Sequence, residues 1–211
     1  MDAALHLDDP GLWTQVLADV RQTAGKPALF LDRDGTINVD TGFPRSPDDI
    51  VLREEIVPVI KAANDAGLPA VIVSNQSGIA RGMFGWKDFA AVNARLLEAL
   101  EERGCRIEAV LACAYHEDGK PPLGVADHPM RKPNPGMLLR SAELLNLDLA
   151  RSVIVGDKTS DLEAGRRAGL SAGWLVGGEG RQKDAQFVCE PLSSQRDHAA
   201  LRDAIVRLGK K

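Results

Sequence analysis

The chain has 211 residues, of which 26 are Lys or Arg and 30 are Asp or Glu, giving a formal net charge of -4. This length can bury one sizeable hydrophobic core, and the composition excludes a disordered, collagen-like or disulfide-stapled chain. There is no dense block of Lys and Arg and no apolar stretch near the roughly 20 residues of a membrane span, so we expect neither nucleic acid nor membrane partners.

The cysteines and the first residues indicate a cellular compartment. Cys105, Cys113 and Cys189 lie far apart and form no CxxC pair, and the sequence begins MDAALHLDD, which is acidic where an export signal is basic. We therefore expect a cytoplasmic protein that is a monomer and folds as a single domain over residues 1–211.

Residues 1–26 are predicted to form a helical extension. Within them, the stretch Pro10–Thr23 carries Leu12, Val16 and Val20 at helical spacing on one narrow face. We expect this helix to pack against the domain as an accessory element.

Short apolar runs then alternate with amphipathic stretches. The runs are Ala28–Leu31, Ala70–Val73, Ile107–Ala112, Ser152–Val155 and Ala172–Val176. They are apolar on both faces, which is typical of buried parallel strands, and the stretches between them have helical periodicity. A closing helix is expected over Leu201–Leu208 and a long loop over Glu117–Pro135. The pattern predicts a three-layer α/β fold with a Rossmann-like parallel sheet.

Polar residues follow these runs, and in an open parallel sheet ligands bind beyond the carboxyl ends of the strands. The groups are Asp32 with Asp34, the hydroxyl and amide cluster at 74–77, Arg131 with Lys132, and Asp157 with Lys158 and Asp161. Each group alone is typical of a turn, a solvated surface or a helix start. Because all of them fall where one crevice gathers them, together they favour a functional site.

These charges suit phosphoryl transfer. Asp32, Asp34 and Asp157 would repel one another and a phosphate dianion unless a cation lay between them, and Mg²⁺ prefers such oxygen ligands. With Lys132 also beside the phosphoryl oxygens, a carboxylate can attack phosphorus in line. These features predict a magnesium-dependent phosphatase with Asp32 as the nucleophile and Asp34 as the acid and base.

The motifs DRDGT, SNQSG, RKP and GDKTSD, in this order, resemble those of the haloacid dehalogenase superfamily phosphatases. The longer stretches FLDRDGTINVDTGF, VIVSNQSGIARGMF, RKPNPGML and VIVGDKTSDLEAG are most similar to the D-glycero-D-manno-heptose 1,7-bisphosphate phosphatase family. This resemblance runs from about Ala28 to the C-terminal strand, and it implies a sugar-phosphate substrate, expected to be the heptose bisphosphate. The segment between Asp32 and Ser74 is too short for a folded cap, so we expect an open site.

The resemblance also implies roles for single residues. Asp32 and Asp157 would bind Mg²⁺ through their side chains and Asp34 through its backbone carbonyl. Lys132 and Lys158 would hold the phosphoryl group beside Ser74. The implied substrate contacts are Asp40, Thr41, Gly42 and Phe43 in one loop, Asn75, Gln76 and Ser77 after the second run, and Arg131.

One departure from the family concerns zinc. Many members hold zinc in the loop before the Arg-Lys pair through four Cys and His ligands, two of which are Cys directly ahead of that pair. This chain has DHPM at 127–130. Cys113, His116 and His128 remain as candidate ligands, but a structural zinc site needs four, closely paired. We therefore expect no zinc.

Two other functions stay open. A histidinol phosphatase belongs to the same branch and shares the motif layout. A non-catalytic module that binds a phospho-ligand could keep the fold, although it would not need the nucleophile Asp32.

Overall fold

The computed structural model describes residues 5–178, 182–183 and 187–210. Its strands are β1 (Leu7–Asp9), β2 (Leu12–Val16), β3 (Leu29–Leu31), β4 (Ala70–Asn75), β5 (Ala109–Cys113), β6 (Val153–Gly156), β7 (Ala172–Val176), β8 (Gln182–Lys183) and β9 (Val188–Leu192). Its helices are α1 (Val20–Thr23), α2 (Val57–Asp65), α3 (Ser77–Ala80), α4 (Trp86–Glu101), α5 (Gly136–Leu145), α6 (Thr159–Arg167) and α7 (Gln195–Gly209), with short 3-10 helices η1 (Pro47–Asp49) and η2 (Leu149–Arg151).

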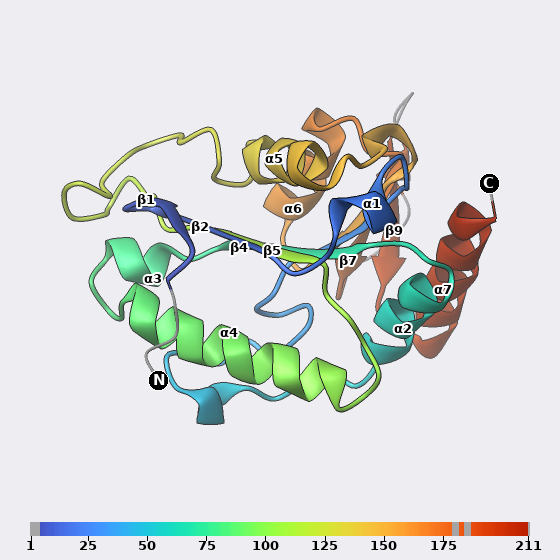
Figure 1. The fold of residues 1–211 in the computed structure, drawn as a ribbon, viewed down its shortest axis with the longest axis horizontal. Coiled ribbons are helices and arrows are strands. Elements are labelled where there is room, and N and C mark those ends of the chain that lie inside the picture. Colours follow the sequence, from blue (N-terminus) through green and yellow to red (C-terminus); the bar gives the residue numbers. More distant parts are fainter. Residues whose placement is uncertain (1–4, 179–181, 184–186, 211) are drawn as a thin grey trace.

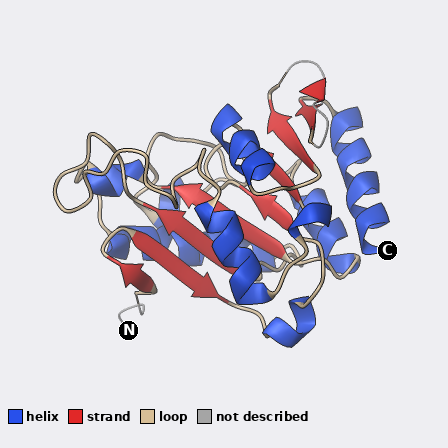
Figure 2. Cartoon of the chain, turned by 90° about the horizontal axis from the view of Figure 1, so that it is seen from above, coloured by secondary structure: helices blue, strands red, loops and turns tan. Residues whose placement is uncertain are grey.

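One sheet forms the middle layer, with helices on both faces (Figure 1). Within the described residues it has 9 strands in the order β1-β2-β5-β4-β3-β6-β7-β9-β8. Neighbouring strands from β5 to β9 run parallel, which confirms the predicted α/β class, and every strand predicted from an apolar run is present. The sheet is nevertheless mixed, because β1, β2 and β8 pair antiparallel at its two ends (Figure 2).

The pleat of the strands divides the interior into two cores. Leu29 and Leu31 of β3 pack on the face covered by α2, α4 and α7, whereas Phe30 between them packs on the face covered by α5 and α6. The side chains of the neighbouring strands β4 and β6 alternate between the two faces in the same way, because successive side chains of a strand point to opposite faces. This double burial explains why the runs are apolar throughout.

Three further expectations are confirmed. The closing helix is α7, whose Leu201 and Ile205 are buried. The stretch 117–135 contains no helix or strand. Between Asp32 and the start of β4 at Ala70 the chain forms η1 and α2 as its only helices, and α2 packs on the sheet, so no cap covers the strand ends.

The predicted N-terminal helix is wrong. Residues 7–16 form the β1–β2 hairpin, β2 pairs with the whole length of β5, and only Val20–Thr23 is helical. The hairpin turns at Pro10 and Gly11, where the Gly11 N–H donates to Asp9 Oδ1 at 2.7 Å. A Pro-Gly pair is a turn signal that breaks a helix, and pairing by β2 prevents β5 from being an open edge.

Strands β8 and β9 were not predicted either. The run Val188–Leu192 contains Glu190 and Pro191, which interrupt its apolar pattern. Proline is tolerated there because, among the described residues, β8 pairs with β9 only at Val188 and Cys189, so no acceptor on β8 requires the N–H that Pro191 lacks.

The hairpin is fixed to the domain by Trp13, which is 2% exposed. Its ring lies against Trp86, at a centroid distance of 6.0 Å, and Phe89, at 5.1 Å. Trp13→Ala should lower the free energy of unfolding by about 3–5 kcal/mol, because it leaves a large cavity in the core. Urea unfolding measures this, with the exposed Leu17→Ala as a control that should change it by less than about 0.5 kcal/mol. Equal stability of the two variants would contradict this packing.

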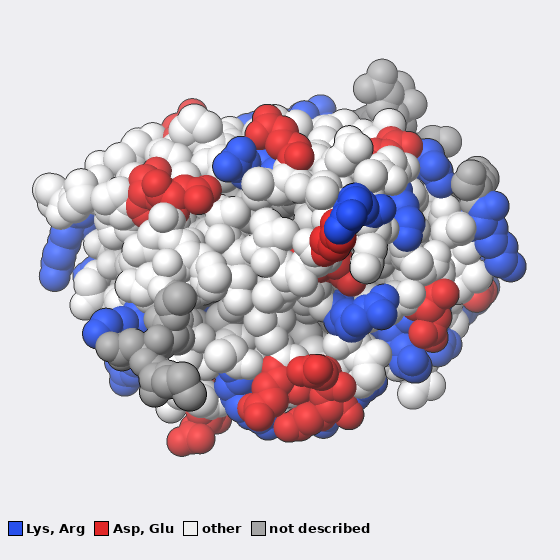
Figure 3. Space-filling view, in the orientation of Figure 1, with Lys and Arg blue, Asp and Glu red and all other residues white. Residues whose placement is uncertain are grey.

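On the face seen in Figure 3, acidic side chains gather over the C-terminal half of α4 and lie among basic ones. Arg95 pairs there with Glu98 and Glu102, and Arg103 pairs with Glu54. In the part of the chain that the structure describes, no helix is both long and apolar enough to cross a bilayer.

Candidate active site

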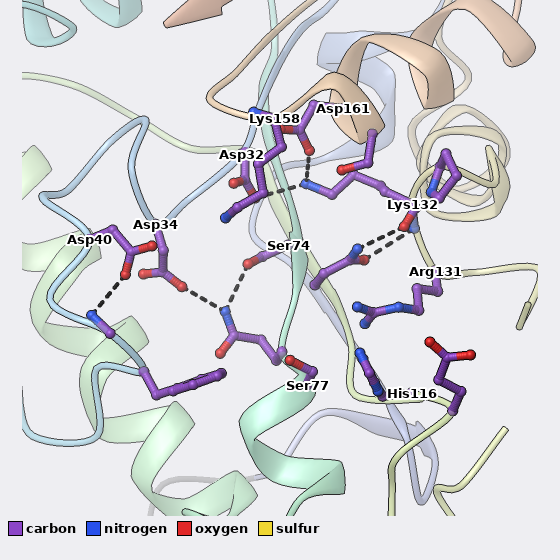
Figure 4. A pocket seen from close by; sticks show the side chains of 17 residues that line it. Asp32, Asp34, Asp40, Ser74, Ser77, His116, Arg131, Lys132, Lys158 and Asp161 are labelled. Atoms are coloured by element: carbon purple, nitrogen blue, oxygen red, sulfur yellow. Dashed lines mark hydrogen bonds and ion pairs between the residues drawn. The ribbon is translucent and has the colours of Figure 1, made fainter. Parts of the chain in front are cut away.

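The first carboxylates lie where β3 ends. The Asp32 N–H donates to the Val155 carbonyl at 2.9 Å, so pairing with β6 continues up to the predicted nucleophile. The chain then turns at Gly35, whose φ of 85° is unstrained only for glycine. Asp32 is almost fully buried yet lines the pocket, and Asp34 lies on the same wall (Figure 4).

Lys132 is the buried cation of the site. Its Nζ donates to Asp32 Oδ1 at 2.8 Å and to the Val73 carbonyl at 2.6 Å, and it lies 2.6 Å from Asp161 Oδ1. These acceptors match the three protons of the ammonium group. Asn75 fixes the backbone of this residue, because it accepts from the Lys132 N–H at 3.1 Å and donates to the Lys132 carbonyl at 2.9 Å.

The buried charges shift the pKa values of one another. Burial raises the pKa of Asp32 to about 7; the charge of Lys132 opposes this rise and that of Asp161 adds to it. Burial would lower the pKa of Lys132, but the charges of Asp161 and Asp32 outweigh burial and raise it. The lysine therefore stays charged across the neutral range.

Asp32, Asp157 and Asp161 can hold a metal ion. One oxygen of each lies within 4.8 Å of the others, and the described residues contain no other group of three such ligands. Asp157 Oδ1 is buried without a hydrogen-bond partner, which leaves an acceptor for a cation. Gly35 makes room for this carboxylate, since a Cβ there would collide with Asp157 Oδ2. The residues present therefore fit Mg²⁺.

Asp161 was predicted to lie at this edge of the sheet but was given no role; it is 1% exposed and lies at the start of α6. Its Oδ2 accepts from the Lys158 N–H at 3.0 Å, and its Oδ1 contacts Lys132. Both oxygens of Asp161 are thus engaged, whereas Asp157 Oδ1 has no hydrogen-bond partner, so Asp161 is the member of this group with the least capacity left for a cation. The spacing of Asp157 and Asp161 in GDKTSD was the signal for this residue.

Asp34 and Ser74 meet through Gln76, whose Nε2 donates to Asp34 Oδ2 at 2.9 Å and to Ser74 Oγ at 2.8 Å. Arg33, fully buried, donates to both Asp34 oxygens, at 3.0 and 2.8 Å. Burial would raise the pKa of Asp34, but the charge of Arg33 and these hydrogen bonds outweigh it and lower the pKa. In this arrangement Asp34 is an ionised carboxylate.

One pocket of about 540 Å³ gathers most of the predicted residues (Figure 4). Its wall includes Asp32, Asp34, Asp40, Gly42, Phe43, Ser74, Asn75, Gln76, Ser77, Arg131, Lys132 and Lys158. Thr41 does not line this pocket. The Gly42 N–H donates to Asp40 Oδ1, and Thr41 lines a smaller neighbouring pocket. Asp157 lines a separate cavity on the other side of Gly35, although its carboxylate approaches Asp32.

The end of the pocket away from Asp32 contains residues that were not predicted, namely His116 and Glu117, which follow β5. Arg81 Nη2 lies 3.2 Å from His116 Nε2, and Arg131 Nη1 donates to the Tyr115 carbonyl at 3.0 Å. Among the described residues Arg131 forms no ion pair, so its half-buried charge is available to an anion.

Cys113, His116 and His128 form no three-ligand group within the described chain. Cys113 is buried in β5, and burial raises the pKa of its thiol to about 11. His128 stacks on Tyr115, with ring centroids 4.0 Å apart. The absence of zinc stays a prediction, which metal analysis of the purified protein tests.

Comparison with known proteins identifies the family. Residues 129–199 match the HAD-hydrolase-like family. The D-glycero-beta-D-manno-heptose-1,7-bisphosphate 7-phosphatase of Mesorhizobium japonicum is 54% identical over 204 residues, which cover 97% of this chain and 94% of that protein. The chain belongs to the haloacid dehalogenase-like phosphatases.

Solved structures agree with this haloacid dehalogenase-like assignment. A HAD-like phosphatase from Mesorhizobium loti superposes with a TM-score of 0.95 and 54% identity, covering 99% of both chains. The D,D-heptose 1,7-bisphosphate phosphatase from B. bronchiseptica, in complex with magnesium and phosphate, gives 0.67 and 29% identity, covering 84% of this chain and 99% of that one. Magnesium thus occurs in a relative, and the cluster of Asp32, Asp157 and Asp161 predicts the same ion for this haloacid dehalogenase-like chain.

Proposed function

We propose that this phosphatase removes the 7-phosphate of D-glycero-D-manno-heptose 1,7-bisphosphate through an aspartyl-phosphate on Asp32. One observation carries the proposal: Asp32 has one oxygen held by Lys132, and its side chain borders a pocket whose far end carries Arg131, which forms no ion pair among the described residues. Within the described residues, no hydrogen bond is found to Asp32 Oδ2, which suits that atom for attack.

In the first step Asp32 Oδ2 forms a bond to phosphorus while the bond from phosphorus to the sugar oxygen breaks. Lys158 and Ser74 would hold the phosphoryl oxygens, and Lys132, whose protons are taken by Asp32, Asp161 and the Val73 carbonyl, would attract them through its charge. Mg²⁺, held by Asp32 and Asp157 and by the Asp34 carbonyl, would neutralise the charge that builds up on them. The sugar oxygen takes its proton from Asp34. Asp34 must first be protonated, and it then loses the hydrogen bonds that it accepts from Arg33 and Gln76.

In the second step water attacks phosphorus, and the bond between phosphorus and Asp32 breaks. Asp34 accepts the proton of this water, a role that suits its ionised state, and inorganic phosphate leaves. The same carboxyl therefore serves both half-reactions.

The arginine at the far end favours a bisphosphate over histidinol phosphate. Arg131, which forms no ion pair among the described residues, would attract a second phosphate and repel the ammonium group of histidinol, whereas Arg81 beside His116 already pairs with Asp118 at 3.4 Å. Phe43, Asn75 and Ser77, together with Asp40 and Gly42, would contact the sugar between the two ends. The names of the relatives support the same substrate.

Phosphate release tests this function. Both anomers of the heptose bisphosphate, histidinol phosphate and p-nitrophenyl phosphate should be compared at equal enzyme concentration. We expect the highest kcat/KM on the bisphosphate. A higher kcat/KM on histidinol phosphate would show that the heptose bisphosphate is not the substrate. No turnover of any of these compounds would favour a non-catalytic module.

Magnesium binding should depend on pH. Asp32 has a pKa of about 7, so below that value the ion must displace a proton from it. The apparent Kd for Mg²⁺ should therefore rise about tenfold for each pH unit below 7 and level off above it. Calorimetric titration at pH 6 and pH 8 measures this, and chelation should abolish turnover until Mg²⁺ is restored. Equal Kd values would contradict the role of Asp32 as a ligand.

A cytoplasmic location, a monomeric state and a single domain over residues 1–211 stay predictions from the sequence.

A further inference from the structure

The loop that carries Arg131 is held by aromatic and hairpin contacts. His128 stacks on Tyr115 with the ring planes 17° apart, and Tyr115 is buried. The loop backbone closes onto the same histidine: the Met130 N–H donates to His128 Nδ1 at 3.2 Å and the Arg131 N–H to the His128 carbonyl at 2.9 Å.

The turn of the β1–β2 hairpin also contacts Tyr115. The Tyr115 hydroxyl donates to Asp9 Oδ1 at 3.1 Å. A Cβ on Gly11 would lie 2.5 Å from the Tyr115 ring, so the backbone of the turn packs directly against this ring. The Ala114 N–H also donates to the Gly11 carbonyl at 2.8 Å.

We propose that Gly11, Tyr115 and His128 form a metal-free brace that positions Arg131 at the far end of the pocket. The carbonyl of Tyr115 accepts from Arg131 Nη1, so one residue holds both the loop backbone, through its ring, and the guanidinium, through its main chain. Figure 4 shows Arg131 between Lys132 and His116, aimed into the pocket. The proposal rests on the proposed function, in which Arg131 binds the phosphate that is not removed.

None of the brace residues lines the pocket, so they act through Arg131 and are positioning residues. The brace also lies where the family resemblance implies a zinc site in other members. Burial lowers the pKa of His128, which keeps its ring neutral for stacking. Because no metal positions Arg131 in this arrangement, binding of the distal phosphate should be unchanged after treatment with a zinc chelator.

Kinetics with two substrates separate positioning from a general structural role. Tyr115→Leu should raise KM for the heptose bisphosphate about tenfold with kcat within about twofold of wild type, since a displaced guanidinium weakens binding of the distal phosphate only. Gly11→Val, which pushes on the ring from outside the pocket, should do the same. Both variants should keep the wild-type kcat/KM on p-nitrophenyl phosphate, which has no second phosphate. Tyr115→Phe, which keeps the stack, should stay within about threefold of wild type.

The Arg131→Met background gives the deciding comparison. Adding Tyr115→Leu there should cause no further rise in KM, because the residue it positions is gone. The same tenfold rise in that background, or equal losses on both substrates, would overturn the proposal. Urea unfolding confirms that each variant is folded.

Hydrogen exchange gives an independent measurement. In Tyr115→Leu the amides of Met130 and Arg131 should exchange faster than in wild type, and in Tyr115→Phe they should not. Unchanged exchange in Tyr115→Leu would overturn the brace. If wild type hydrolyses p-nitrophenyl phosphate but not the heptose bisphosphate, the proposed function fails, and exchange alone decides on the brace.

Discussion

Asp32→Asn is expected to lower kcat by about four orders of magnitude or more, because an amide cannot form the covalent phosphoryl intermediate. The fold should survive, since the change preserves volume and Lys132 keeps Asp161 and the Val73 carbonyl as partners. Phosphate release measures the rate. Acid quenching during turnover should trap phosphate on wild type in a form that hydroxylamine releases, and should trap none on the variant.

A matched change at Asp48 controls for the loss of a charge. Asp48 is an exposed carboxylate in η1 outside the pocket, so Asp48→Asn should leave kcat within about twofold of wild type. Activity of Asp32→Asn near that of Asp48→Asn would show that another group receives the phosphoryl.

Lys132→Met should strongly destabilise the fold. It leaves Asp32 and Asp161 buried together without the cation that both contact, and breaking such a buried pair costs about 3–5 kcal/mol. For a chain of this size the melting temperature should fall by about 6–20 °C. Because Mg²⁺ can replace part of the missing charge, saturating Mg²⁺ should raise the melting temperature of Lys132→Met more than that of wild type.

Lys158→Met is the matched control for this prediction. It removes a lysine from the same pocket, but the Lys158 side chain is 58% exposed and its Nζ lies 3.5 Å from Asp157 Oδ2. An exposed pair contributes less than about 1 kcal/mol, so its melting temperature should stay close to that of wild type. If both lysine variants melted alike, the buried triad would not stabilise the fold as its geometry implies.

The catalytic end of the site could be predicted because its residues lie next to apolar runs. Asp32, Ser74 and Asp157 each follow or end a buried parallel strand, and the carboxyl ends of such strands meet at one edge of the sheet. Their position depends only on strand direction and the pleat, which the pattern of apolar residues reveals. The same rule applied to β5 would have indicated His116.

The far end of the pocket could not be predicted because it depends on contacts between distant segments. The stack of His128 on Tyr115 joins two ends of an irregular loop, and no periodicity records it. The hairpin that supports Tyr115 was predicted as a helix, because Leu12, Val16 and Val20 fit helical spacing by chance. Only the register of β2 with β5 brings Gly11 against that ring.

The pairing of Leu12 with Cys113 has a consequence for assembly on the ribosome. The hairpin is synthesised before every other strand but must wait for β5, so this edge of the sheet closes late, after a long loop has been brought together. The strands that carry Asp32 and Ser74 can already be paired by then. Nascent chains halted before β5 emerges should therefore leave Trp13 accessible to a quencher, and chains released after it should protect that indole.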